Sequence, residues 1–225
     1  MITASVKTKI EQIINVFETS SIAGKYDALV VMKDGKDNSR QITYGRSQTT
    51  EQGNLRTLVE MYITRNGIFA NDFKPFRTKI GKEPLADNAD FKNLLRKAAR
   101  EDLIMRNAQD EFFDILYYTP ALAFFTSLKL TLPLSLLVVY DSFIHSGGVP
   151  AFLRERFPET PPSVAGGNEK AWVKAYVKTR HEWLATNKKV LLQKTIYRTQ
   201  CFLDQIKADN WSLKKPVDAN DIMVP

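Results

Sequence analysis

Two carboxylates near the N-terminus have surroundings suited to acid–base chemistry. Glu18 follows Phe17 at the C-terminal end of an apolar helical pattern, where apolar neighbours and the negative end of the helix dipole both favour a proton donor. Asp34 precedes Gly35 in a polar, solvated turn. Hydrolysis of a glycosidic bond needs a proton donor and a second carboxylate. The pair is therefore a candidate acid and base, although spacing alone fits a surface glutamate and an ordinary Asp-Gly turn better.

Three predicted elements position this pair. Apolar residues at helical spacing predict helices over residues 3–17 and 53–64. Between them, residues 26–45 have the pattern of a β-hairpin, with Asp34 in its turn. Glycines and prolines interrupt residues 65–88, which we expect to form a long loop that connects two lobes.

The remainder of the chain is predicted to be mainly helical. Its most apolar helix, over residues 133–144, begins at Pro133 and ends before Gly147 and Gly148. After a loop at residues 158–168, two further helices are expected over about 169–185 and 188–208.

The whole pattern predicts a mainly α protein of α+β class in a single catalytic domain, residues 1–225. An N-terminal lobe, about 18–65, would contain a small antiparallel sheet, and a helical C-terminal lobe would span about 90–210.

Composition excludes several classes of protein. With 44% hydrophobic residues and one cysteine, the chain can bury a core but cannot form an internal disulfide. Two histidines and that cysteine argue against a zinc site, so no metal or cofactor is expected.

The net charge of +7 fits an anionic partner or simple solubility; no nucleic-acid motif accompanies it. The apolar run at 130–140 is too short to span a membrane, and the N-terminus lacks a signal-peptide pattern.

Three charged residues interrupt the apolar faces of late helices. Asp141 lies in the most apolar helix, Arg180 shares a face with Trp172 and Leu184, and Arg198 shares one with apolar neighbours of its own helix. A buried charge is costly unless it is paired. We therefore expect Asp141, Arg180 and Arg198 to meet. The nearby His145 is interpreted as a structural capping or core residue.

The segment around the two acids resembles a known family. Tyr26 is followed by seven residues and then Asp34; Glu18 lies eight residues before Tyr26, and Tyr44-Gly45 closes the motif. This pattern resembles the chitosanases of glycoside hydrolase family 46, in the lysozyme-like superfamily. Further segments resemble that family in the same order and extend the likeness over most of residues 10–208. They are residues 108–114, 117–121, 139–147, 169–172 and 196–198.

The resemblance implies a lysozyme-like fold with two lobes around a substrate cleft and an inverting mechanism. Glu18 would be the general acid and Asp34 the general base acting through a water, with Asp37 a rival for the base. Asp141, Arg180 and Arg198 would form a network that positions Glu18.

Two departures from the family pattern concern the turn and the substrate. At the position where the family has the threonine or serine that orients the water, this sequence has Arg40. Ser39 and Thr43 lie nearby and are the candidates for that role. The family also has an aspartate that holds a glucosamine amino group, and this sequence has Asn54 at that position. Glu51 could take the place of the missing aspartate. The candidate substrate-binding residues are Tyr26, Gly45, Asn54 and Tyr117, the last because tyrosine rings stack on sugars.

These features predict an endo-acting hydrolase of β-1,4 linkages in chitosan. Two alternatives stay open. Since chitosan is itself a polycation, the +7 charge and Asn54 favour a lysozyme-like enzyme acting on peptidoglycan, and a catalytically silent glycan-binding relative is the third hypothesis. The expected partner is a polysaccharide, with no nucleic-acid or membrane partner. A monomer is expected, and the resemblance implies secretion.

Overall fold

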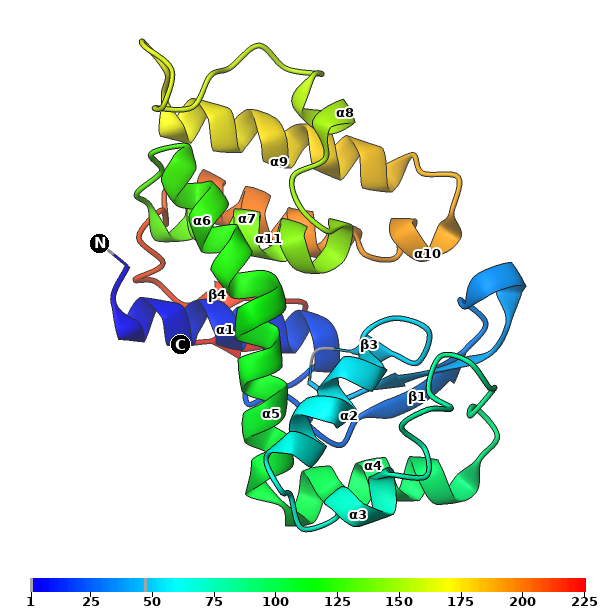
Figure 1. The fold of residues 1–225 in the computed structure, drawn as a ribbon. Helices are drawn as coiled ribbons and strands as arrows, with labels where there is room; N and C mark the ends of the chain where they lie inside the picture. The colour runs from blue at the N-terminus through cyan, green and yellow to red at the C-terminus, as the bar shows by residue number, and fades with distance from the viewer. Residues whose placement is uncertain (1, 47) are drawn as a thin grey trace. The chain divides into compact units, whose positions relative to one another are not determined.

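The computed structural model describes residues 2–46 and 48–225, which fall into two compact units. The helical unit comprises Met1–Ile22 and Ile115–Pro225, and the sheet unit comprises Ala23–Asp114. Helices predominate in both (Figure 1), and the largest sheet is small and antiparallel. The predicted fold class, mainly helical with one small antiparallel sheet near the N-terminus, is confirmed.

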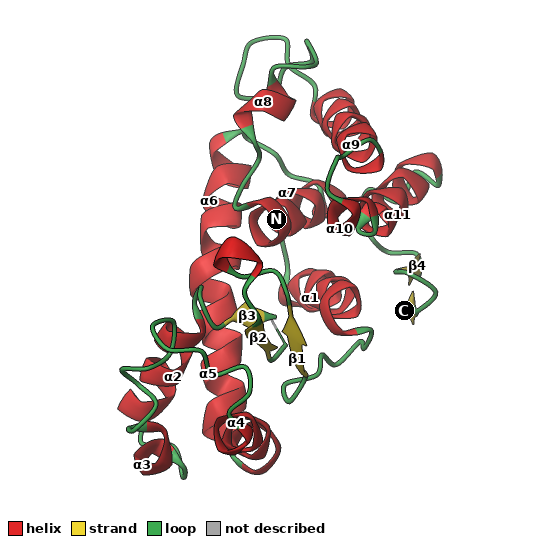
Figure 2. Cartoon of the chain, turned by 90° about the vertical axis from the view of Figure 1, so that its right-hand side faces the viewer, coloured by secondary structure: helices red, strands yellow, loops and turns green. Residues whose placement is uncertain are grey.

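The sheet of the sheet unit has three strands, β1 (Leu29–Met32), β2 (Gln41–Tyr44) and β3 (Thr49–Thr50), in the order β1-β2-β3. Strands β1 and β2 form the predicted hairpin, with Leu29 opposite Tyr44 and Met32 opposite Gln41. The connection between them contains one short 3-10 turn, η1 (Lys36–Asn38). Figure 2 shows these strands in yellow among the red helices. Asp34 therefore lies just beyond the last residue pair of the hairpin.

Four helices complete the sheet unit: α2 (Leu55–Thr64), α3 (Ala70–Phe73), α4 (Ala89–Glu101) and α5 (Leu103–Phe113). Asp102 begins α5, because its side chain accepts a hydrogen bond from the Ile104 amide at 2.9 Å. Its other oxygen accepts one from the buried Tyr62 hydroxyl at 2.6 Å. The predicted loop at residues 65–88 also contains the short helix α3, a difference from the sequence-based expectation.

The helical unit is built around one buried helix, α7 (Pro133–Ser146). Residues 134–142 of α7 are all buried, and the helix ends at Gly147, whose φ of 71° is the left-handed conformation that glycine adopts readily. Helices α1 (Ala4–Thr19), α9 (Glu169–Ala185) and α11 (Ile196–Lys207) pack against it. The unit's other elements are η2 (Asp114–Tyr118, which enters it from α5), α6 (Thr119–Ser127), α8 (Ala151–Arg154), α10 (Val190–Gln193), β4 (Val217–Asp218) and β5 (Met223–Val224).

Two boundaries differ from the predictions. Helix α1 continues to Thr19, so Glu18 lies inside its last turn rather than after the helix. The helix predicted over 188–208 is broken into α10 and α11, and the Thr195 hydroxyl at the break donates to the Leu192 carbonyl at 2.7 Å. Such side-chain bonds to the backbone compete with helix continuation. Within the described residues, no helix has the length and apolar character needed to cross a bilayer.

Candidate active site

Glu18 is held by an arginine from the far end of the chain. Arg198 Nη2 lies 2.5 Å from Glu18 Oε1, and only 10% of the glutamate side chain and 6% of the arginine side chain are exposed. The last turn of α1 is fixed as well, because the Tyr197 hydroxyl donates to the Phe17 carbonyl at 2.9 Å. The Arg198 guanidinium also lies over the Phe17 ring, 5.3 Å from its centre. Helix α11 thus fixes both the backbone and the carboxylate at this end of α1.

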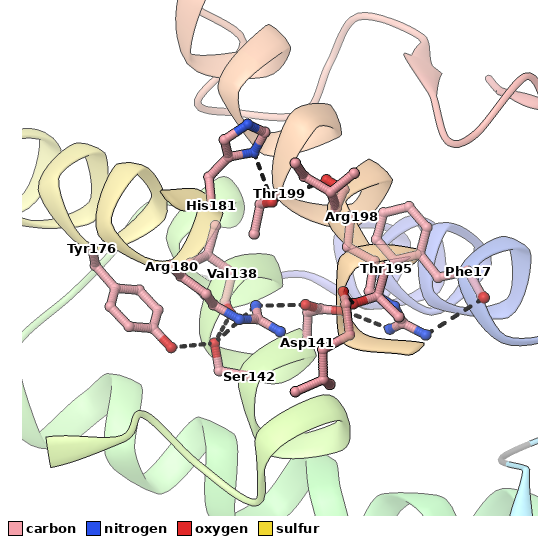
Figure 3. A network of polar contacts seen from close by, with 12 residues as sticks. Phe17, Val138, Asp141, Ser142, Tyr176, Arg180, His181, Thr195, Arg198 and Thr199 are labelled. Carbon is pink, nitrogen blue, oxygen red and sulfur yellow. Dashed lines mark hydrogen bonds and ion pairs between the residues drawn. The ribbon is translucent and has the colours of Figure 1, made fainter. Parts of the chain in front are cut away.

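Behind this contact lies a buried carboxylate, Asp141, shared by two arginines (Figure 3). Arg198 Nη1 donates to its Oδ1 and Arg180 Nη1 to its Oδ2, both at 2.7 Å. Burial opposes the charge on Asp141, but Arg180 and Arg198 outweigh it and hold the pKa of this carboxyl below its ordinary value. In this cluster, the carboxyl groups of Glu18 and Asp141 therefore face the guanidinium groups of Arg198 and Arg180.

Polar neighbours complete the cluster around Arg180. Its Nη1 also donates to the Ser142 hydroxyl at 3.3 Å, and Tyr176 donates to the same hydroxyl at 2.9 Å. The Ser142 hydroxyl donates a hydrogen bond to the Val138 carbonyl at 2.8 Å. The structure therefore brings the three predicted charges together and joins them to Glu18.

His145 lies in the last turn of α7, close to this cluster. Within the described residues its buried Nδ1 has no hydrogen-bond partner. Burial lowers the pKa of the ring to about 4; the attraction of Asp141 opposes this effect, and Arg180 and Arg198 add to it. The ring is consequently neutral at pH 7 and packs as part of the structure.

In the sheet unit, Asp34 is an exposed residue of the hairpin turn with one buried partner. Gln41, which is only 5% exposed, donates from Nε2 to Asp34 Oδ1 at 3.0 Å. The rival base Asp37 lies in η1 with a left-handed φ of 56° and is exposed. No described residue forms a hydrogen bond or ion pair with its carboxylate. Of Asp34 and Asp37, only Asp34 receives a side-chain hydrogen bond from a described residue.

The two hydroxyls predicted to orient a water differ in their surroundings. Ser39 is exposed in the turn and accepts a hydrogen bond from Gln52 Nε2 at 2.8 Å. Thr43, on β2, is 6% exposed, and its Oγ1 is buried without a partner among the described residues. Ser39 therefore has access to solvent and a proton to donate, whereas the Thr43 hydroxyl is enclosed.

The sequence matches a family model over nearly its whole length: residues 12–217 match that of glycosyl hydrolase family 46. The chain belongs to glycosyl hydrolase family 46. It is therefore a glycoside hydrolase, and the resemblance inferred from its motifs is confirmed.

Relatives of this family 46 chain include a chitosanase from Bacillus subtilis (strain 168), 25% identical over 228 residues, which cover 94% of this chain and 80% of the relative. Among solved structures, native chitosanase from Bacillus subtilis MY002 matches with a TM-score of 0.84 at 22% identity over 100% of both chains. The Gynuella sunshinyii chitosanase matches with a TM-score of 0.83 at 22% identity, over 100% of this chain and 99% of that one. These structures share the fold.

Two residues of the family 46 motif are bound into the scaffold of the sheet unit. The Tyr26 hydroxyl donates to Asp110 at 2.8 Å, and Arg46 reaches the same carboxylate at 2.5 Å. Gly45 has a φ of 79°, and a Cβ there would lie 2.4 Å from Gln109 Oε1, so the position requires glycine. These partners are 64 to 84 residues away in sequence. Gln109 and Asp110 lie in the family-like segment 108–114, but the sequence assigned neither of them a role.

Asn54 and Glu51 have opposite environments. Asn54 precedes α2, is exposed, and makes no side-chain capping bond. Glu51 is 2% exposed, and its two oxygens accept from the backbone amides of Ile42 at 3.1 Å and Leu85 at 2.7 Å. The expectation that Glu51 substitutes for the missing aspartate conflicts with this geometry, because both of its oxygens are committed to the backbone.

The tyrosine pair of η2, in the helical unit, divides into a core residue and a more exposed one. Tyr118 is 8% exposed and packs edge-on against Tyr140, with ring centres 5.3 Å apart. Tyr117 is half-buried. Tyr117 is therefore the more exposed member of the pair.

Proposed function

We propose that this family 46 hydrolase cleaves β-1,4 linkages inside chitosan chains. The observation that carries the proposal is the family match over residues 12–217, together with the buried cluster that holds Glu18. The Bacillus subtilis relative is a chitosanase. The solved relatives include a complex with chitotetraose and a variant complexed with six glucosamine units.

Glu18 is the proposed general acid and Asp34 the proposed general base of one catalytic domain. Glu18 gives its proton to the leaving glycosidic oxygen as the bond to the anomeric carbon breaks. Asp34 removes a proton from a water that attacks this carbon from the opposite face, which inverts its configuration. The bond from Arg198 supports the orientation of Glu18, and the bond from Gln41 supports that of Asp34.

Ser39 is the proposed water-orienting hydroxyl. It accepts a hydrogen bond from Gln52, so its own proton is available for a water oxygen. Tyr26, Gly45, Asn54 and Tyr117 remain the proposed sugar contacts. Asp141 and Arg180 act behind Arg198 and keep its guanidinium on Glu18. We further propose that the enzyme acts as a monomer outside the cell, where a polymer of this size is available.

Peptidoglycan is a second candidate substrate because of two specific observations. Chitosan carries positive charge, as does this protein, with a net charge of +7. At the position where the family has an aspartate for the amino group, the exposed Asn54 offers no charge.

A digestion assay separates the candidate substrates. Release of reducing ends is measured from chitosan, from fully N-acetylated chitin and from cell walls. We expect release chiefly from chitosan; release only from cell walls would establish the second candidate. Glycan binding without cleavage of any polymer would contradict both.

The same assay assigns the base. We expect Asp34→Asn to abolish turnover and Asp37→Asn, its matched control in the same turn, to retain it. The reverse pattern would move the base to Asp37.

A further inference from the structure

We propose that Gln41 is the positioning residue for the catalytic base, an inference that rests on the proposed role of Asp34. Gln41 is the first residue of β2 and lies opposite Met32, the last residue of β1. It is 5% exposed, whereas Asp34 is exposed. A rigid, buried amide at the end of the hairpin therefore donates to one oxygen of the exposed carboxylate.

The direction of this hydrogen bond is fixed by the backbone. The Gln52 amide N–H lies 3.1 Å from Gln41 Oε1. A backbone N–H can only donate, so this end of the Gln41 side chain must be the carbonyl oxygen. The NH₂ group consequently faces Asp34 Oδ1 at 3.0 Å and orients the carboxylate that accepts a proton.

Gln52 also ties down the turn that carries Asp34. Its Oε1 accepts from the Lys36 amide at 2.7 Å, and its Nε2 donates to Ser39 at 2.8 Å. Gly35 lies against this side chain, because a Cβ there would be 2.7 Å from Gln52 Nε2 and 2.6 Å from the Ser39 hydroxyl. The backbone of Gln52 therefore orients Gln41, and its side chain fixes the turn at the first residue of η1 and at Ser39, the residue after η1.

This arrangement leaves one oxygen of Asp34 for the reaction. Gln41 donates to Oδ1, and none of the described residues forms a hydrogen bond or ion pair with Oδ2. A carboxylate held at one oxygen cannot rotate freely, so Oδ2 keeps a fixed direction toward the attacking water. Asp37, three residues further along the same turn, has no comparable hydrogen bond from any residue that the structure describes.

The test compares Gln41→Glu and Gln41→Met with Gln48→Glu. Gln41→Glu keeps the oxygen that accepts from Gln52 but replaces the donor to Asp34 by a second carboxylate, and Gln41→Met removes the donor without adding charge. Gln48 donates to the Gly45 carbonyl at 2.9 Å, is part-buried in the same unit, and makes no bond to Asp34. Its variant therefore matches the change in charge and in size.

We expect both Gln41 variants to lower kcat by about ten- to a hundredfold with KM within about twofold, since a hydrogen bond to a charged group is lost. Because two nearby carboxylates resist joint ionisation, Gln41→Glu should also move the acidic limb of the pH–rate profile to higher pH by about one unit. Gln48→Glu should move neither kcat nor the limb. If Gln41→Glu does not fold, the kcat of Gln41→Met alone tests the role of Gln41.

Unchanged kcat in both Gln41 variants would overturn the role of Gln41. The role would also fail if Gln48→Glu lost as much kcat and the acidic limb of Gln41→Glu did not move. Asp34→Asn, assayed in parallel, separates the positioning role of Gln41 from the role of Asp34 as the base. If Asp34→Asn is inactive and the Gln41 variants behave as wild type, only the positioning role fails. If Asp34→Asn retains full turnover, the assignment of the base itself fails.

Discussion

Arg198 and Glu18, 180 residues apart in sequence, form a nearly buried ion pair with Nη2 and Oε1 separated by 2.5 Å. The second nitrogen of the same guanidinium is bound by Asp141 at 2.7 Å. Burial lowers the pKa of Arg198, but Glu18 and Asp141 outweigh it and raise this pKa above its ordinary value. Arg198 is therefore a permanent cation that orients the proposed acid from a fixed point in the core.

Glu18→Gln is expected to lower turnover by at least about a hundredfold, because the proton donor is lost while an oxygen remains to accept from Arg198. A substrate with an activated aryl leaving group, which needs little protonation, should recover much of the rate. Glu11→Gln serves as the control on the same helix, where Glu11 pairs with Lys7 at 3.6 Å near the surface. An equal loss on both kinds of substrate would show that Glu18 is not the acid.

Asp141→Asn should lower the free energy of unfolding by about 3–5 kcal/mol, because two buried arginines lose the carboxylate between them. The matched control is Asp209→Asn, which breaks an exposed pair with Lys170 and should leave stability unchanged. Denaturant titrations of the three proteins measure the effect. Equal stability of Asp141→Asn and wild type would contradict the view that this cluster holds the helical unit together.

The lowered pKa of His145 should make the protein less stable in mild acid. Its folded pKa is about 4, below the ordinary 6.5. Between these values the unfolded chain binds a proton that the native chain does not, so stability falls as the pH falls from about 6.5 to 4. Asp141 adds a loss at lower pH, because its depressed pKa stabilises the fold above the ordinary value of 3.8 and this contribution disappears through the folded value.

The measurement for His145 is the free energy of unfolding of wild type and His145→Gln at pH 7 and pH 4.5. The variant lacks the titrating ring, so wild type should lose about 2 kcal/mol more than the variant on acidification. Parallel losses in the two proteins would contradict the assignment.

Asn54→Asp is expected to strengthen the binding of deacetylated substrate. A carboxylate at this exposed position can pair with a glucosamine ammonium, and exposed charge pairs contribute modestly, so KM should fall by about two- to fivefold. Asn54→Gln keeps the amide and is the uncharged control. The effect should be absent with N-acetylated oligomers; an equal effect on both oligomers would exclude ammonium recognition at this position.

Local signals in the sequence located the main elements. Pro133 and Gly147 mark the two ends of α7, and two strand-like runs joined by a polar turn predicted the β1–β2 hairpin. The meeting of Asp141, Arg180 and Arg198 followed from the cost of an unpaired buried charge. The inferences about α7 and about the buried charges succeeded because proline, glycine and an unpaired buried charge each cost free energy in most other surroundings.

The support of Asp34 was not visible in the sequence. Glutamines occur at many surface positions, and the role of Gln41 depends on the hairpin register that places it beside Asp34. The break between α10 and α11 likewise depends on one local bond of Thr195. Glu51 appeared available for substrate until its two backbone partners were known. Such roles are set by tertiary contacts rather than by residue type.

The most direct test of the proposed reaction is proton NMR of the anomeric centre formed during the first minutes of chitosan hydrolysis, before the product anomers equilibrate. An acid and base acting through a water on a β-1,4 linkage must release the α-anomer first. Early appearance of the α-anomer, abolished in Glu18→Gln and Asp34→Asn, is the predicted result. Early appearance of the β-anomer, or release that persists in either variant, would contradict the account.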